Sequence, residues 1–154
     1  ARTVAGVTVR DLYEVYPGFD IDPDAEQALL DQHDAVVWQH PLYWYSCPSL
    51  LKEWLDVVLE YGWAYGPKGD RLQGKAVLSA ITTGGPAEAY QPGGSNRFLI
   101  AQLLTPFEQT ARLCGMDWQD PFVVHGSHQL DHAALESAAS NYQQRLAALT
   151  GATL

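Results

Sequence analysis

Two short segments of the sequence carry residue types suited to holding a flat ring. The first, Pro41–Ser46, brings together Tyr43, Trp44 and Tyr45 where a loop would usually be polar. Aromatic side chains offer flat apolar faces at small entropic cost, so they suit the face of a planar ligand. A run of aromatics more often packs in a core, and both interpretations stay open from this segment alone.

The second segment, Thr82–Gly85, combines two hydroxyls with two glycines. Because glycine has no Cβ, its backbone N–H is open to close approach. Such donors could bond the carbonyl and ring-nitrogen edge of a heterocycle whose face rests on the three aromatics. A Thr-Thr-Gly-Gly stretch is often only a turn, but the two segments together favour a ligand site.

These segments need a scaffold, and the hydrophobic pattern predicts one in which strands and helices alternate. Strands are expected at Val7–Leu12, Ala35–Gln39, Lys75–Thr82 and Trp118–His125; helices are expected from Asp22-Pro23 to Gln32, from Pro48 to Glu60, from Asn96 to Gly115 with a restart at Thr105-Pro106, and onward from a cap at Asp131. This order predicts one α/β domain over residues 1–154, with a mainly parallel sheet and helices on both faces. Ligands of such folds bind at the carboxyl ends of strands, where both segments fall.

The composition and charge of the chain exclude some classes of binding partner. The chain has 154 residues, 47% of them hydrophobic and 18% charged, which is typical of a globular domain. Acidic residues outnumber basic ones by 18 to 9, and the basic ones are scattered. Nucleic acid and anionic membrane surfaces require a concentrated basic patch, so neither is expected as a partner. An anionic ligand would have to be held locally, by backbone N–H groups and helix N-termini.

The two cysteines, Cys47 and Cys114, lie far apart in a sequence with no secretory signal and no long apolar run. This pattern indicates a reduced, cytoplasmic protein. Cys47 precedes a predicted helix start, where a lowered pKa would make it reactive, but a small packed side chain is the favoured interpretation.

Three histidines near the C-terminus, His125, His128 and His132, have spacings that could suggest a metal site. They fall on a strand end, a loop and a helix start, so they share no helical face. The only carboxylate among them, Asp131, is better used as a helix cap, and we predict no metal site.

Four stretches carry a resemblance to a known family: HPLYWYSCPSLLKEWLD, GWAYG, GKAVLSAITTGG and LCGMDW. They resemble the NAD(P)H:quinone oxidoreductases of flavodoxin-like fold. Within that family they are similar to the bacterial branch that includes ancillary subunits of glutathione-gated potassium-efflux systems. The resemblance extends from the N-terminus to about residue 146 and implies a flavodoxin-like doubly wound sheet.

The resemblance implies FMN as cofactor, with FAD as the alternative, and NAD(P)H as co-substrate. The positions that match the segment along the isoalloxazine and ribityl chain are Pro41, Leu42, Tyr43, Trp44 and Tyr45; the family often has Gln at Tyr43. The positions that match the segment at the N5 and O4 edge of the ring are Thr82, Thr83, Gly84 and Gly85.

The resemblance also assigns catalytic and dimer positions. Tyr90 matches the tyrosine of a Tyr/His pair that faces the flavin. Asn96 stands at the histidine position, where it can form hydrogen bonds but cannot carry an imidazolium charge. Trp63 and Tyr65 match aromatics that wall the partner's site in the family's homodimers.

The expected activity is two-electron, ping-pong reduction of a quinone-like acceptor. The alternatives are a regulatory subunit that docks on a membrane transporter at the inner face of the cell membrane, and an FMN-dependent nitro- or azoreductase.

One departure from the family concerns the start of the sequence. The family begins with a strand, a His- and Ser-rich loop for the FMN phosphate, and a helix, whereas Ala1 matches a position near the end of that helix. We therefore expect the natural protein to be longer, with the additional strand in the middle of the sheet. If these 154 residues were the whole protein, tight FMN binding would not be expected, because the phosphate anchor would be absent.

Overall fold

An open parallel sheet organises the chain, and its longest strands are β1 (Ala35–Pro41) and β2 (Ala76–Thr82). Two short strands, β3 (Asp117–Trp118) and β4 (Phe122–Val124), both pair with β2, so β2 lies between β1 and the β3–β4 stretch. All the pairings are parallel. The computed structural model describes residues 1–151; the last three residues of the predicted domain lie outside the described part.

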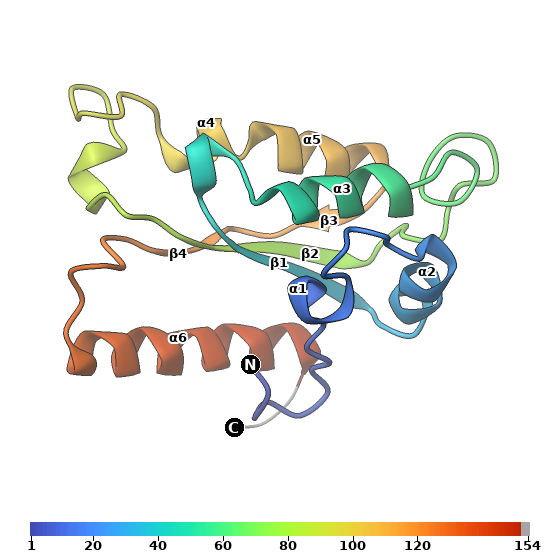
Figure 1. Cartoon of the computed structure of the whole chain (residues 1–154), viewed down its shortest axis with the longest axis horizontal. Helices are drawn as coiled ribbons and strands as arrows, with labels where there is room; N and C mark the ends of the chain where they lie inside the picture. Colours follow the sequence, from blue (N-terminus) through green and yellow to red (C-terminus); the bar gives the residue numbers. More distant parts are fainter. Residues whose placement is uncertain (152–154) are drawn as a thin grey trace.

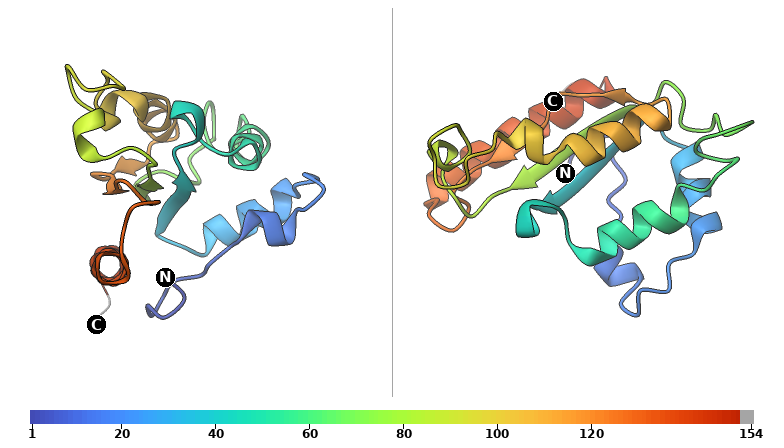
Figure 2. Two further views of the ribbon diagram at one scale, coloured as in Figure 1. Left: turned by 60° about the vertical axis from the view of Figure 1, so that its left-hand side comes forward. Right: turned by 90° about the horizontal axis from the view of Figure 1, so that it is seen from above.

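Helices flank both faces of this sheet (Figures 1 and 2). One face is covered by α3 (Ser49–Val58), α4 (Ile100–Leu103) and α5 (Thr105–Leu113), and the opposite face carries α6 (His132–Thr150). The short α1 (Leu12–Val15) and α2 (Pro23–Asp31) lie beyond the β1 edge. Two single 3₁₀ turns, η1 (Tyr43–Tyr45) and η2 (Ala87–Ala89), follow the carboxyl ends of β1 and β2. The predicted α/β class is confirmed.

Alternation along β1 explains the two-layer core. Trp38 faces α5, with its ring 6.0 Å from that of Phe107. The next residue, Gln39, faces α6, where its Oε1 accepts a hydrogen bond of 2.9 Å from the Tyr142 hydroxyl. Because side chains alternate across a strand, β1 contacts helices on both faces of the sheet.

The predicted helix boundaries are confirmed where a capping side chain sets them. The Asp22 carboxylate accepts from the Ala25 N–H at 3.1 Å, and the Asp131 carboxylate accepts from the Ala134 N–H at 2.8 Å. At Thr105-Pro106 the chain ends α4 and begins α5, as the proline predicts.

Two strand predictions are corrected. Val7–Leu12 is not a strand: residues 7–11 are irregular, and the Asp11 carboxylate caps α1 by accepting from the Tyr13 N–H at 3.1 Å. An alternating pattern makes a strand only where another strand lies beside it, and in the described chain none does. Trp118–His125 forms two short strands instead of one, because Pro121 has no N–H to donate to the ladder.

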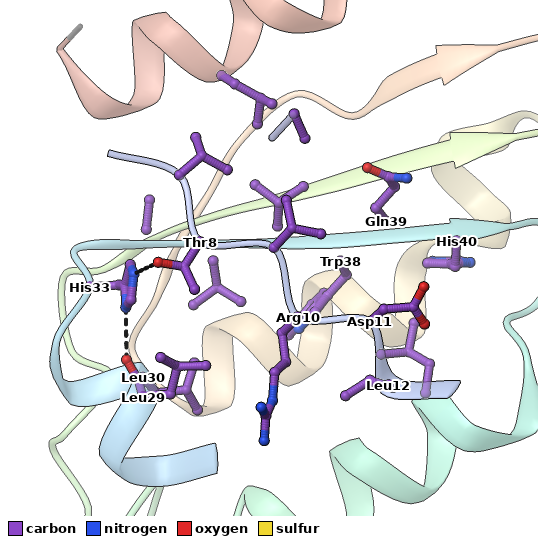
Figure 3. Close-up of a pocket in the computed structure, with 18 of the residues that line it drawn as sticks. Thr8, Arg10, Asp11, Leu12, Leu29, Leu30, His33, Trp38, Gln39 and His40 are labelled. Atoms are coloured by element: carbon purple, nitrogen blue, oxygen red, sulfur yellow. Dashed lines mark hydrogen bonds between the residues drawn. The ribbon is translucent and has the colours of Figure 1, made fainter. Parts of the chain in front are cut away.

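The outer edge of β1 is unpaired within the described residues, and a cavity lies along it. Bonds from the Leu42 N–H to the Thr82 oxygen and from the Ala76 N–H to the Asp34 oxygen show that even-numbered residues of this strand direct their backbone groups toward β2. The backbone groups of Val37 and Gln39 therefore point the other way. On that side a cavity of about 410 Å³ separates β1 from the irregular N-terminal segment, whose Thr8, Arg10 and Asp11 line it (Figure 3).

Two buried polar atoms in side chains that line this cavity lack partners among the described residues: Trp38 Nε1 and His40 Nε2. Their side chains come from residues only 3% and 5% exposed. The other nitrogen of His40, Nδ1, donates to the Pro41 oxygen at 3.0 Å, and burial lowers the pKa of this histidine. The ring is therefore neutral, with Nε2 as an unused acceptor. Buried groups of this kind normally have a hydrogen-bond partner.

No helix within residues 1–151 has the length and apolarity needed to cross a bilayer.

Hydrogen exchange tests the open edge. The amides of Val37 and Gln39, which point into the cavity, should exchange at least about tenfold faster than those of Val36 and Trp38, which bond to β2. Residue-resolved exchange by NMR measures this directly. Equal protection at all four amides would show that the edge is covered.

Candidate functional site

The parallel register brings the two predicted loops together. Pro41 pairs with Thr82 at the last rung of the β1–β2 ladder, and the Leu42 N–H donates to the Thr82 oxygen at 2.8 Å. The aromatic segment continues from Leu42 into η1, and the Thr82–Gly85 segment leaves β2 at the same edge. The predicted proximity of the two segments is confirmed.

The aromatic segment does not pack in the core. Trp44 is 94% exposed, and Tyr43 and Tyr45 are more than half exposed. Trp44 and Tyr45 also have positive φ angles of 48° and 61°. A left-handed backbone costs a residue with a Cβ roughly 1–2 kcal/mol, so the loop stores strain while presenting apolar rings to solvent. This combination favours the interpretation of the segment as a ligand wall.

In the Thr82–Gly85 segment, one hydroxyl forms a hydrogen bond within the segment and two backbone N–H groups are left open. The hydroxyl of the buried Thr83 is used internally, because it donates to the Gly85 oxygen at 2.8 Å. The N–H groups of Gly84 and Gly85 have no hydrogen-bond partner in the described chain. A Cβ placed on Gly84 would meet only the His128 ring, at 3.6 Å, so that backbone is open. Two unused donors therefore lie at this edge of the sheet.

The two positions matched to the Tyr/His pair are placed differently from each other. Tyr90 is buried, and its ring lies close to the backbone of Gly85 and 5.6 Å from the ring of His125. Asn96 instead accepts a hydrogen bond from the Tyr45 hydroxyl at 3.3 Å, which connects it to the aromatic segment. The imidazole beside Tyr90 is thus that of His125.

The sequence interpretation considered His125 only as a metal ligand. Its place directly after the last strand is the signal that could have assigned it to the site, since all carboxyl strand ends share one edge. His128 also approaches this edge, beside Gly84. Among the described residues, no three His, Cys, Asp or Glu side chains are grouped as a metal site would need.

Trp63 and Tyr65 lie away from the two loops. They belong to the turn that follows α3, at the opposite end of that helix from the aromatic segment (Figure 1). Tyr65 packs edge-on against Tyr61, with ring centroids 5.7 Å apart. Within one chain they do not join the site.

The two cysteines line a groove of about 290 Å³ in which residues of α3 and α5 take part. Burial raises the pKa of both the Cys47 and the Cys114 thiol. Both are therefore neutral thiols near pH 7, which supports the packing interpretation of Cys47 over a reactive one.

Comparison with known proteins identifies the family to which this fold belongs. A family model described as flavodoxin-like fold matches residues 1–146. The glutathione-regulated potassium-efflux system ancillary protein KefG of Enterobacter sp. (strain 638) is 50% identical over 147 residues, which cover 96% of this chain and 80% of that protein.

Solved structures are also similar. General stress protein 14 of Treponema denticola, in complex with FMN, is 45% identical with a TM-score of 0.83, covering 94% of this chain and 80% of that one. An NADPH-quinone reductase of P. pentosaceus is 31% identical with a TM-score of 0.79, covering 87% and 85%. A thermophilic tryptophan halogenase of Streptomycin violaceusniger is 45% identical with a TM-score of 0.92, covering 94% and 84%.

The chain belongs to the flavodoxin-like family. Among the members of that family it is related to the ancillary proteins of glutathione-regulated potassium-efflux systems, with about half of its residues identical to theirs.

The strain at Trp44 can be measured apart from any ligand. Replacing Trp44 by Gly should raise the free energy of unfolding by roughly 0.5–1 kcal/mol, because glycine adopts positive φ without a Cβ penalty and an exposed ring contributes little. Urea denaturation measures the change.

Tyr13→Gly is the matched control for this prediction, because Tyr13 is another exposed aromatic residue but lies within α1. It should lower stability, since glycine disfavours a helix. Equal losses in the two variants would contradict the strain at Trp44.

Proposed function

We propose that this chain is an FMN-dependent NAD(P)H:quinone oxidoreductase. The observation that carries the proposal is the placement, at adjacent strand ends, of three exposed aromatic rings beside two unused backbone donors. One surface suits the face of a flat ring and the other suits its polar edge. The activities named for the similar structures differ among themselves, and the geometry of this site supports an activity that uses a flat ring as its cofactor.

The residues present fit the ring of FMN. Tyr43, Trp44 and Tyr45 are exposed and strained on one side, as ligand-contacting residues commonly are. On the other side, Gly84 and Gly85 leave their N–H groups free, and the open space at Gly84 lets a heterocycle approach the backbone. The FMN complex of the Treponema denticola relative supports the same cofactor.

When bound, FMN supplies two-electron chemistry between a nicotinamide and a quinone. The chain's own residues then have three tasks. The aromatic segment holds a flat ring and excludes water from its face. The N–H groups of Gly84 and Gly85 stabilise negative charge at the ring edge. Thr83 and Tyr90 keep that edge in place, the first through its bond to the Gly85 oxygen and the second through its packing beside Gly85.

The same slot would serve the nicotinamide and the acceptor in turn, which gives ping-pong kinetics. In a homodimer, Trp63 and Tyr65 would wall the slot of the partner subunit. Their position after the end of α3 supports this division, because that helix begins after the aromatic segment and Trp63 and Tyr65 follow its other end.

We also propose that a strand parallel to β1 fills the cavity beside it and carries the phosphate-binding loop. The unpaired backbone groups of Val37 and Gln39 and the unpartnered Trp38 Nε1 support this. The cavity extends as far as Pro41 and Pro48, so a loop after such a strand would emerge near the aromatic segment. Protein in which the cavity is filled should show Val37 and Gln39 amides as slow to exchange as Val36.

A second function is favoured by one specific finding, the 50% identity to KefG, an ancillary protein of a potassium-efflux system. The chain would then dock on a transporter at the inner face of the membrane, with its redox activity secondary. A nitro- or azoreductase would share the cofactor and differ in its acceptor.

Turnover tests the main proposal. FMN-loaded protein should oxidise NADPH or NADH when a benzoquinone is added, with parallel lines in a double-reciprocal series as ping-pong kinetics require.

Trp44→Ala should release FMN more readily, seen as loss of flavin absorbance after gel filtration, because it removes the exposed ring.

Leu113→Ala is the matched control, since Leu113 is exposed on α5 and belongs to neither loop. It should retain FMN as the parent does. Protein that binds FMN without quinone-dependent oxidation, yet activates a potassium-efflux system, would favour the regulatory function instead.

A further inference from the structure

The hydrogen bonds around Thr83 fix the protonation pattern of His125. The Thr83 hydroxyl has one proton, which it donates to the Gly85 oxygen at 2.8 Å. The contact of 3.1 Å between the same hydroxyl oxygen and His125 Nδ1 must therefore use a proton on the imidazole. His125 carries a hydrogen on Nδ1, and its Nε2 is left for other partners.

Three backbone bonds hold His125 rigidly at the site. The Thr83 N–H donates to the Val124 oxygen, the Ser127 N–H donates to the Thr83 oxygen, and the Gly126 N–H donates to the Gly85 oxygen, each at 2.9 Å. The chain on both sides of His125 is thus fastened to the segment that presents the free N–H groups. The backbone that carries the imidazole therefore moves together with that edge.

The free face of the ring points to a role in chemistry. His125 is partly exposed, and its Nε2 has no partner among the described residues and is not enclosed by the protein. The Tyr90 ring packs against the imidazole at an angle of 36°. When one ring nitrogen of a histidine is held by a hydrogen bond and the other is free, the free nitrogen is oriented for proton transfer.

The Glu88 carboxylate interacts electrostatically with His125, the Tyr90 ring packs against it, and His128 lies beside Gly84 at the same edge. Burial lowers the pKa of His125, and the Glu88 carboxylate opposes this in part. The imidazole of the free site is accordingly neutral near pH 7. A negative charge placed beside Gly84 and Gly85 would stabilise the imidazolium and raise the pKa, so that the ring gains a proton when the site becomes anionic.

We propose that His125, oriented by Thr83, is the acid–base residue of the site and donates a proton from Nε2 to the reduced acceptor. This inference rests on the proposed function. Converting a quinone to a hydroquinone requires two electrons and two protons. A hydride equivalent from NAD(P)H brings both electrons and one proton, which leaves a phenolate oxygen. The Nε2–H bond of the imidazolium breaks, an O–H bond forms, and the neutral imidazole regains its proton from water.

The assignment explains how Asn96 is compatible with activity. An amide cannot deliver a proton as an imidazolium can, and Asn96 is engaged with the Tyr45 hydroxyl. His125 supplies the titrating group from a different strand end, beside Tyr90. The site therefore keeps a tyrosine next to a histidine, with the histidine contributed by the segment after β4.

The test compares His125→Gln with the parent in two measurements. The first is kcat/KM for a benzoquinone across pH: the parent should lose activity about tenfold per pH unit above the pKa of His125, and the variant should be about 100-fold slower at low pH and independent of pH. The second is the ¹⁵N spectrum of the imidazoles in the flavin-free protein, which should show the His125 proton on Nδ1, and its loss from that nitrogen in Thr83→Val.

His132→Gln is the matched control, and it should keep the parent's pH profile. An unchanged profile in His125→Gln, or a profile that is lost in His128→Gln instead, overturns the assignment while leaving the proposed function intact. Absence of any quinone turnover in the parent overturns the proposed function and the acid–base role together. A His125 proton on Nε2 in the flavin-free protein overturns the assignment whatever the turnover shows.

Discussion

The parallel pairing of β1 with β2 is the constraint on which the rest of the structure depends. Seven residues of each strand pair in register, and the last rung joins Pro41 to Thr82. A shift by one residue would turn every side chain of β1 to the opposite face and separate the two loops. The register is fixed by burial on both faces: Trp38 fits against α5, and Val37 packs with the cluster formed by the N-terminal segment and α6. Core packing thus determines where the aromatic segment meets the threonine–glycine segment.

From this constraint follows a site that binds by local groups. The chain carries a formal charge of −9, so its overall field repels an anionic cofactor. Attraction must come from backbone donors at short range, and Gly84 and Gly85 provide two of them. The aromatic rings add apolar contact that charge does not affect. The strained backbone at Trp44 is maintained because the loop is fastened at both ends, by the Leu42 bond to β2 and by the start of α3.

Much of the fold could be predicted from the sequence, because the capping residues and the hydrophobic pattern indicate the same helices and strands. The caps at Asp22 and Asp131 and the proline restart at Thr105-Pro106 are determined by neighbouring residues, so they are visible without a structure. Val7–Leu12 has a strand pattern but no strand beside it in the described chain, and pairing is a tertiary property that periodicity does not contain.

The candidate site, like the fold, could be predicted from the sequence only in part. The two loops could be predicted, because each combines distinctive residue types with a place directly after an apolar strand. The role of Thr83 could not, since the bond of its hydroxyl to the Gly85 oxygen depends on the turn geometry. His125 was missed because it lies 42 residues from Thr83, and only the pairing of β4 with β2 brings them together.

The most direct measurement of the central claim is a titration of the ¹⁵N-labelled protein with FMN, followed by backbone amide shifts. The Trp44 amide in one loop and the Gly84 and Gly85 amides in the other should shift together, with a common dissociation constant, while those of Tyr61 and Tyr65 in the monomer stay in place. Shifts confined to one loop, or largest in the groove between α3 and α5, would contradict the claim that a single flat ring is held between the two strand ends.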